Sequence, residues 1–180
     1  MASLSYAVFK TPIGPCGIAW GNRGIAGVQL PESEEAETRT RVLERFPDAR
    51  EAPPSPDVRR AIDVLVALLG GEPNNLSGIV LDMSGVTAFS RRVYEVARTI
   101  PPGATLSYGD IAARLGAPGA ARAVGQALGR NPFALIVPCH RVIAAAGKLG
   151  GFSAHGSIAT KARLLAIEGP RGPEKEMARG

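Results

Sequence analysis

The segment Pro138–Val142, with the sequence PCHRV, places a cysteine directly beside a histidine. The apolar run Ala134–Val137 before it predicts a short buried strand that presents Cys139 at its end. The thiolate is the nucleophilic form of cysteine, and a free thiol with a pKa of about 8.5 is mostly protonated at neutral pH. A base or cation nearby raises the thiolate fraction, so the pair Cys139 and His140 indicates nucleophilic attack by sulfur. The ordinary alternative for a free cysteine is a small buried hydrophobe.

The other cysteine, Cys16, lies between a proline and a glycine, which predicts a turn and a structural role. Two widely separated cysteines make no disulfide framework, and a reducing cytoplasm suits them. The sequence has no C-x-x-C pair, so we expect no metal and no cofactor.

The sequence also lacks an apolar run of about 20 residues and a signal peptide. We therefore expect a cytoplasmic protein without a membrane partner.

Charge is divided unevenly along the 180 residues. Residues 1–85 contain 8 Lys and Arg against 11 Asp and Glu, whereas residues 86–180 contain 13 against 5. A basic half beside an acidic half indicates that one part of the chain meets a polyanion such as nucleic acid. Solvated basic faces are also common, so the asymmetry supports this interpretation without establishing it.

Residues 1–85 predict an α/β domain with a small antiparallel sheet. Strands are expected at Ser5–Phe9 and Gly24–Leu30, separated by Gly, Pro and Asn turn signals. Amphipathic helices are expected over 33–46 and 57–69, and the alternating residues of 79–83 predict a last strand. A link between domains is expected at residues 84–87.

Residues 86–169 predict a mostly helical domain, followed by a disordered tail over 170–180. A helix is expected from Phe89 to Ile100. Ser107 and Asp110 have the spacing of a capping box and open a helix over 108–115. A Gly-containing turn and a second helix over 120–129 complete a helix-turn-helix pattern.

The second of these helices is unusual for a DNA-reading helix because it offers few side chains that recognise base edges. The small residues Ala121 and Gly125 permit a close approach to a narrow groove, while Arg122 and Gln126 are its long polar groups. This combination favours insertion into the minor groove. The alternative is a packed internal helix with a surface arginine.

Taken together, these residues resemble the O6-alkylguanine-DNA alkyltransferases, also called methylated-DNA–protein-cysteine methyltransferases. The matching block consists of Ser107–Gly109, Ala121–Gly125, Asn131–Pro132, Pro138–Val142, Gly150–Ser153 and Leu164–Gly169. Residues 1–85 resemble the N-terminal domain of the family more loosely, through Thr11–Gly14. The resemblance implies a ribonuclease-H-like supporting domain over 1–85 and a helix-turn-helix, winged-helix-like domain for DNA binding and alkyl transfer over 86–169.

The activity that the resemblance implies is DNA repair by irreversible transfer of an alkyl group from O6-alkylguanine in double-stranded DNA to Cys139. Activity on O4-alkylthymine is left open. The modified base must be flipped out of the duplex to be reached. Arg122 would fill the space left in the stack, and Tyr108 would press on the phosphate, hold the base and protonate guanine N3. Each molecule would act once, as a monomer.

The resemblance also implies a relay from Cys139 through a water to His140 and then to Glu168. Adjacent residues of an extended segment point to opposite faces, so His140 is not expected to touch the sulfur directly. The carboxylate would orient the imidazole and stabilise its charged form. An exposed residue at a helix end is the alternative for Glu168. Arg141 is expected either to form a structural pair or to contact phosphate.

The expected substrate pocket comprises Asn131, Val142, Phe152 and Ser153. Asn131 would brace the turn before the active site, and Ser153 would bind the guanine together with backbone groups near Val142. Two positions depart from the family: Phe152 stands where tyrosine is frequent, and Ala134 replaces a common proline. The loop over 154–157 is about two residues longer than in some relatives, and the zinc ligands of some N-terminal domains are missing.

Two other functions remain open from the sequence. A sensor could bind and flip alkylated bases without transferring the alkyl group. A thiol enzyme acting on small molecules, such as a Cys/His hydrolase, would turn over and would need no DNA. Salt-sensitive DNA binding separates the DNA proteins from the hydrolase, and a gain of mass on Cys139 separates transfer from sensing.

Overall fold

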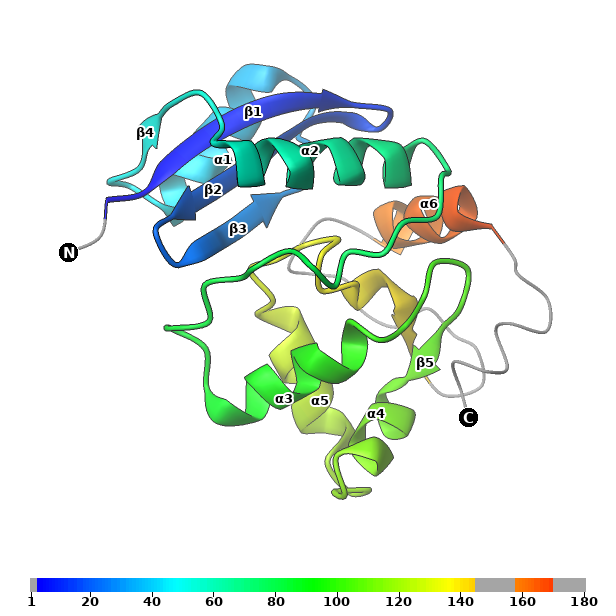
Figure 1. Cartoon of the computed structure of the whole chain (residues 1–180). Helices are drawn as coiled ribbons and strands as arrows, with labels where there is room; N and C mark the ends of the chain where they lie inside the picture. The colour runs from blue at the N-terminus through cyan, green and yellow to red at the C-terminus, as the bar shows by residue number, and fades with distance from the viewer. Residues whose placement is uncertain (1–2, 145–157, 170–180) are drawn as a thin grey trace. The chain divides into compact units, whose positions relative to one another are not determined.

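The computed structural model describes residues 3–144 and 158–169, and the chain forms two compact units (Figure 1). The first unit comprises Met1–Gly85 together with Pro132–Ile136, and the second comprises Val86–Asn131 together with Val137–Gly180. The sequence did not predict that five residues from the second half of the chain belong to the first unit.

A four-stranded sheet forms the centre of the first unit (Figure 1). Strands β1 (Ser5–Thr11), β2 (Gly14–Gly21) and β3 (Gly24–Gln29) form an antiparallel meander. The two-residue strand β4 (Arg50–Glu51) pairs parallel to β1, which gives the order β3-β2-β1-β4. The sheet is therefore mixed and not purely antiparallel, because the chain returns to the β1 edge only after crossing through a helix.

Strand β2 corrects the prediction that Cys16 lies in a turn. Cys16 pairs with Phe9 across the sheet and is fully buried, and burial raises the pKa of its thiol to about 12. The Gly and Pro residues of this segment resemble turn signals, but the reversal itself is confined to Pro12 and Ile13. The expected structural role of Cys16 fits this buried position in the sheet.

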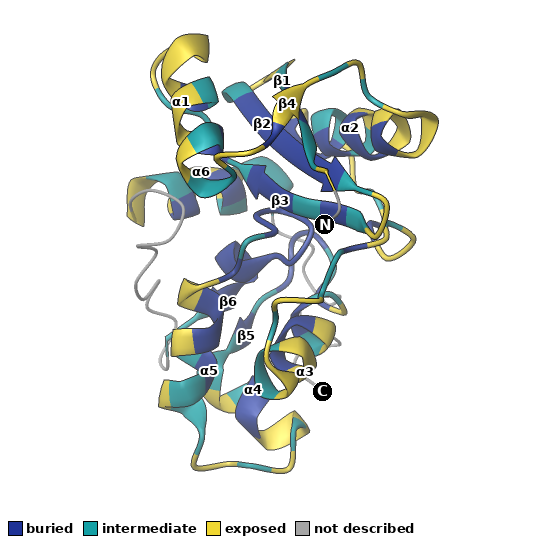
Figure 2. Cartoon of the chain, turned by 90° about the vertical axis from the view of Figure 1, so that its left-hand side faces the viewer, coloured by how far each residue is buried: buried dark blue, intermediate teal, exposed yellow. Residues whose placement is uncertain are grey.

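Two helices cover the sheet on opposite faces, as Figures 1 and 2 show from perpendicular directions. Helix α1 (Glu35–Arg45) buries Val42 against β2, where a Cβ added at Gly17 would lie 2.4 Å from the valine Cγ2. Helix α2 (Pro56–Leu69) begins at Ser55, whose side chain accepts a hydrogen bond from the Val58 amide. Both helices lie close to their predicted ranges.

The strand expected over 79–83 is wrong, because only an isolated bridge joins Leu81 to Ile25. The Ile25 amide donates to the Val80 carbonyl, and the Asp82 amide donates to the Ile25 carbonyl. Leu81 is buried and Val80 beside it is 68% exposed, so the alternation of apolar residues does mark the buried side of this segment, although the segment forms no strand.

Four helices and a two-stranded parallel pair form the described part of the second unit (Figure 1). The elements are α3 (Ala88–Ala97), β5 (Leu106–Ser107), α4 (Tyr108–Arg114), α5 (Ala121–Gly129), β6 (Val142–Ile143) and α6 (Ile158–Glu168). The Tyr94 hydroxyl donates to the Ala127 carbonyl at 2.7 Å and so fastens α3 to α5. None of the helices within 3–144 and 158–169 is both long and apolar enough to span a bilayer.

The helix-turn-helix and its capping box are confirmed. The Asp110 amide donates to the Ser107 hydroxyl at 2.9 Å, and the Ser107 amide donates to the Asp110 carboxylate at 2.8 Å. Gly116 ends α4 with a φ of 74°, a conformation that favours glycine. Helix α5 follows after the short turn and packs against α4.

Candidate active site

The segment that leads to Cys139 is buried, as predicted, but it is not a strand. Leu135 has a φ of 73°, and the Ile136 amide donates to the Ala134 carbonyl at 2.9 Å across it. The Cys139 amide makes a second such tight turn by donating to the Val137 carbonyl at 2.8 Å. The apolar residues therefore reflect burial on both sides of an irregular loop, which periodicity alone does not distinguish from a buried strand.

Cys139 begins a single turn of 3₁₀-helix, η1 (Cys139–Arg141), and not the end of an extended segment. The Arg141 amide donates to the Pro138 carbonyl, and the Val142 amide donates to the Cys139 carbonyl. The exposed fractions are 6% for Cys139, 1% for His140 and 4% for Arg141. The turn therefore directs three reactive or charged side chains into the interior of one small unit.

The Glu168 carboxylate, at the C-terminal end of α6, accepts hydrogen bonds from two side chains of this turn. One of its oxygens lies 2.9 Å from His140 Nε2, and Arg141 donates to both oxygens, from Nε at 2.9 Å and from Nη2 at 2.6 Å. The Glu168 side chain is 3% exposed, so the alternative of an exposed helix-end residue is wrong. Arg141 also donates to the Ile100 carbonyl at 2.7 Å, which places it in a structural pair and not on the surface.

These contacts keep the Glu168 carboxyl group ionised. Burial alone would raise the pKa of its carboxyl, but His140 and Arg141 bring that pKa down to about 2. An ionised carboxylate only accepts hydrogen bonds, so His140 Nε2 must carry the proton of the contact. Burial lowers the pKa of His140 although Glu168 opposes this shift, so the imidazole is neutral at pH 7. Its Nδ1 is then the basic atom, and it is buried with no hydrogen-bond partner among the described residues.

Burial raises the pKa of the Cys139 thiol, so the resting form is protonated. The Asn131 side chain, the charge of Lys161 and nearby backbone amides act in the opposite direction and favour the thiolate. Asn131 is 1% exposed and donates from Nδ2 to the Val137 carbonyl at 2.9 Å. The amide thus braces the turn and interacts with the sulfur of Cys139.

Four of the five predicted DNA-binding residues, all except Tyr108, occupy one face of α5. Arg122 and Gln126 are exposed, whereas Ala121 and Gly125 are partly buried beside them. A Cβ added at Gly125 would lie 3.8 Å from the ring of Tyr108, the first residue of α4. Tyr108 is half-buried, and its pKa is raised first by burial and then by the charge of Cys139. The helix-turn-helix therefore places Tyr108 between this face and the cysteine site.

Lys161 is the buried charged residue that sequence reasoning missed. Its exposed fraction is 0%, and its Nζ donates to the Val142 carbonyl at 2.6 Å. The signal in the sequence is the spacing of Lys161, Leu164 and Glu168, which places all three on one face of a helix.

Of the predicted pocket residues, Val142 is fully buried. The predicted pocket residues Phe152 and Ser153, and the loop over 154–157, lie outside the described residues.

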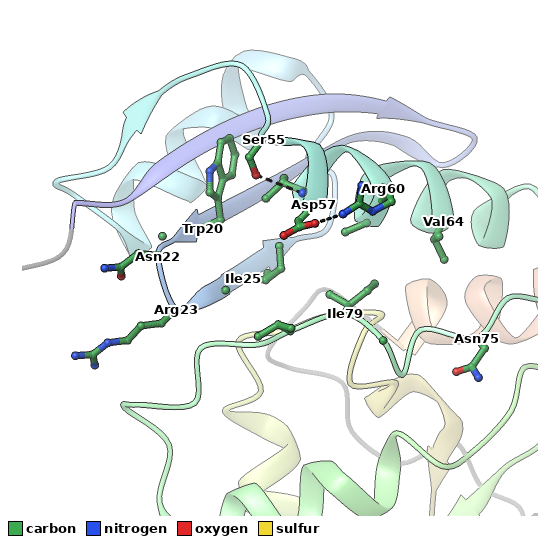
Figure 3. A pocket seen from close by; sticks show the side chains of 16 residues that line it. Trp20, Asn22, Arg23, Ile25, Ser55, Asp57, Arg60, Val64, Asn75 and Ile79 are labelled. Atoms are coloured by element: carbon green, nitrogen blue, oxygen red, sulfur yellow. Dashed lines mark hydrogen bonds and ion pairs between the residues drawn. The ribbon is translucent and has the colours of Figure 1, made fainter.

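A separate hollow of about 510 Å³ lies in the first unit, between the β2–β3 turn, α2 and the chain near Ile79 (Figure 3). Its lining mixes apolar side chains with charged ones, and the carboxylate of Asp57 pairs with Arg60 on α2 (Figure 3). None of the predicted site residues lines it.

Comparisons with known proteins identify the family of this chain. The family model for "6-O-methylguanine DNA methyltransferase, DNA binding domain" matches residues 88–170. The chain is 41% identical over 171 residues to the methylated-DNA–protein-cysteine methyltransferase of Mycobacterium tuberculosis H37Rv, which covers 94% of this chain and 95% of that protein. It is 35% identical over 158 residues to the protein of the same name from Methanothermobacter thermautotrophicus, covering 88% and 81%.

A solved structure of the M. tuberculosis protein in complex with DNA superposes with a TM-score of 0.73 at 37% identity, covering 97% of this chain and 98% of that one. The similarity therefore extends over both units and includes the residues around Cys139. By its sequence and by its α/β fold, this chain belongs to the family of methylated-DNA–protein-cysteine methyltransferases.

Proposed function

We propose that this protein repairs DNA by transferring the alkyl group of O6-alkylguanine to Sγ of Cys139. The observation that carries the proposal is the buried pair of His140 and Glu168 beside the cysteine, in which Nε2 is held by the carboxylate and Nδ1 is left as the base. Family membership supports the same reaction, and the relatives carry it in their names.

The reaction is a displacement at the alkyl carbon. The bond from sulfur to the alkyl carbon forms while the bond from that carbon to guanine O6 breaks. The thiol proton passes to His140 Nδ1, through a bridging water, and Glu168 stabilises the imidazolium that results. Tyr108 donates a proton to guanine N3 as the base leaves, and the phenolate recovers that proton from His140 by way of solvent. The thioether has no route back to thiol, so each molecule reacts once.

The helix-turn-helix supplies the access to the base. An alkyl group on O6 of a stacked and paired guanine is out of reach of a buried cysteine, so the nucleotide must leave the duplex. The small residues Ala121 and Gly125 let α5 approach the minor groove, and the exposed Arg122 enters the space that the base vacates. Gln126 lies one helical turn further along the same face.

The first unit serves as support for the active site. The Val28 amide and Arg45 Nη2 both donate to the Pro132 carbonyl, at 3.0 and 2.8 Å. Residues 132–136, which lie just before the cysteine turn in sequence, are thus fixed within that unit. The strand order β3-β2-β1-β4 supports the ribonuclease-H-like assignment of the first unit, and the β5–β6 pair beside the helix-turn-helix supports the winged-helix-like assignment of the second.

The two cysteines are free thiols, which suit a reducing cytoplasm. We place the protein there, as a monomer that acts on DNA.

Intact-protein mass spectrometry after mixing with a duplex that contains O6-methylguanine tests the proposal. We expect a stoichiometric gain of one methylene, about 14 Da, located on Cys139. Cys139→Ser should show no gain, while Cys16→Ser is the matched control and should react like the unaltered protein. Salt-sensitive binding without a mass gain would identify a lesion sensor instead, and the absence of both binding and mass gain would overturn the assignment to DNA repair.

A further inference from the structure

A closed loop over residues 131–137 precedes the cysteine turn. Asn131 Nδ2 donates to the Val137 carbonyl at 2.9 Å, which joins the two ends of the loop. The same carbonyl accepts the Cys139 amide at 2.8 Å, so the point at which the loop closes is also the point at which the cysteine turn begins. The tip of the loop, Pro132–Ile136, belongs to the first unit. A group that holds this tip therefore also constrains the backbone that carries the sulfur.

The carbonyl of Pro132 is the point at which the first unit holds the loop tip. The Val28 amide on β3 donates to it at 3.0 Å, and Nη2 of Arg45, the last residue of α1, donates to it at 2.8 Å. An isolated bridge pairs Val28 with Phe133, whose side chain is fully buried. A carbonyl oxygen has two lone pairs, and here two donors from different elements occupy them.

Arg45 makes hydrogen bonds only to neutral acceptors among the described residues. Its Nη1 donates to the Val28 carbonyl at 2.9 Å and to Gln29 Oε1 at 3.1 Å, in addition to the contact of Nη2 with the loop. The guanidinium carbon lies 5.1 Å from the centre of the Phe46 ring. A planar guanidinium presents its donors in a rigid fork, so it holds several acceptors in one fixed geometry. The contacts of Arg45 therefore fix the loop tip against β3.

Gly27 on β3 leaves the space that the guanidinium occupies. A Cβ added at this position would lie 2.8 Å from Arg45 Nη2 and 2.7 Å from Phe46 Cζ. Nη2 is the atom that donates to the Pro132 carbonyl. Any side chain at position 27 must push this nitrogen aside, because both atoms are the ends of side chains that can move. Gly27 therefore offers a second way to release the loop tip without removing the arginine.

We propose that Arg45 is a positioning residue for alkyl transfer: by holding the Pro132 carbonyl against β3, it fixes the loop that carries the Cys139 turn. This role rests on the proposed function of Cys139 as alkyl acceptor. Arg45 touches neither the sulfur nor the base, so it acts on the rate of transfer within the complex and not on the affinity for DNA. A displacement of about 1 Å at a reacting atom costs up to roughly 100-fold in rate.

Three substitutions and one control separate positioning from general effects on the helix. Arg45→Met removes the donors and keeps an apolar stem of similar length. Arg45→Lys keeps the charge but replaces the fork with a single nitrogen, and Gly27→Ala displaces the fork while leaving it intact. Arg41→Met is the matched control, because Arg41 is an exposed arginine of the same helix whose ion pairs are with Glu32 and Glu44. Urea unfolding gives the folded fraction of each variant.

Single-turnover methyl transfer is measured over a range of O6-methylguanine duplex concentrations, with rates expressed per folded molecule. We expect Arg45→Met to lower the maximum rate by about tenfold while the half-saturating concentration stays within about twofold. Arg45→Lys should recover part of the loss, and Arg41→Met should match the parent. A maximum rate of Arg45→Met equal to that of the parent, or a change in the half-saturating concentration alone, would overturn the positioning role.

A double-mutant cycle tests whether the two positions act through the same contact. We expect Gly27→Ala to slow transfer, and the double variant with Arg45→Met to be no slower than Arg45→Met alone, since the contact is already lost. Losses that multiply in the double variant would contradict a shared action on the Pro132 carbonyl.

Amide hydrogen exchange without DNA reports the loop independently of the reaction. We expect the amides of Ile136 and Cys139, which close the two tight turns, to exchange about tenfold faster in Arg45→Met and at the parent rate in Arg41→Met. Unchanged exchange in Arg45→Met would overturn the proposed effect on the cysteine turn. If exchange accelerates but the parent itself transfers no methyl group, the proposed function is wrong while the hold of Arg45 on the loop stands.

Discussion

Arg141 and Glu168 form a two-point ion pair in the second unit, with Nε to Oε1 at 2.9 Å and Nη2 to Oε2 at 2.6 Å. The same carboxylate accepts from His140. A carboxylate held by an arginine cannot rotate, so the imidazole that it holds is fixed as well. In the proposed function the pair therefore orients the imidazole that acts as the base, while the arginine itself never needs to approach the substrate.

Replacing this carboxylate should reduce both stability and activity. Glu168→Gln leaves Arg141 buried without its anion, so we expect a loss of about 3 kcal/mol in the free energy of unfolding at pH 7. Without the anion the imidazolium is no longer stabilised, so methyl transfer should slow by roughly 100-fold. Urea unfolding and single-turnover kinetics measure the two effects. Glu95→Gln, on the exposed face of α3, is the control and should change neither.

The stability effect of Glu168 should disappear in acid. Its folded pKa of about 2 lies below the ordinary value of 4.5, so its contribution is fully present above pH 4.5 and is lost as pH falls toward 2. The free energies of unfolding of the parent and of Glu168→Gln should therefore converge over that range. A difference that stays constant from pH 7 to pH 3 would mean that the carboxyl is not the group that titrates.

His140 should make the protein lose stability at mildly acidic pH. Its folded pKa is lowered by burial, so below the ordinary value of 6.5 the unfolded chain takes up a proton that the folded site resists. The stability is present above pH 6.5 and declines as pH falls, by at most about 1.4 kcal/mol per pH unit. Urea unfolding between pH 7.5 and pH 5 should show this slope in the parent and a shallower one in His140→Gln. Equal slopes would contradict the neutral imidazole.

Asn131→Ala should loosen the loop before the cysteine. The Val137 carbonyl loses its donor in the buried interior, and we expect a loss of about 1–3 kcal/mol in the free energy of unfolding. The thiol also loses a hydrogen bond that favours its ionised form, so iodoacetamide should react more slowly near neutral pH. Asn22→Ala in the exposed β2–β3 turn is the control. Unchanged thiol reactivity would restrict Asn131 to a structural role.

Gly17→Ala tests the packing of the first unit. Its added Cβ would lie 2.4 Å from Val42 Cγ2, so α1 must shift away from β2, at a cost of about 1–3 kcal/mol. Gly78→Ala is the matched control because nothing lies within 4 Å of its Cβ position. Chemical unfolding followed by the fluorescence of Trp20, which lies in the same sheet, reports both changes. Equal stabilities would show that α1 adjusts without cost.

The sequence by itself determined the features that depend on local chemistry. The capping box of Ser107 and Asp110 and the helices around it follow from side chains three or four residues apart, where sequence spacing fixes spatial distance. The block from Ser107 to Gly169 also carried the family resemblance, and with it Cys139, His140 and Glu168. Each of these predictions needed only residues in a short window or a motif with a fixed order.

The tertiary structure decided what depends on contacts between distant segments. The run Ala134–Val137 is apolar because it is buried, but its backbone forms two tight turns, with hydrogen bonds from Ile136 to Ala134 and from Cys139 to Val137, and not a strand. A lysine is ordinarily expected on the surface, but Lys161 is buried and donates a hydrogen bond to the Val142 carbonyl. The sequence left two roles open for Arg141, a structural pair or a phosphate contact, and the position of α6 pairs it with Glu168. Burial raises the pKa of Cys139 and lowers those of His140 and Lys161, and burial is a property of the packed chain that no local window contains.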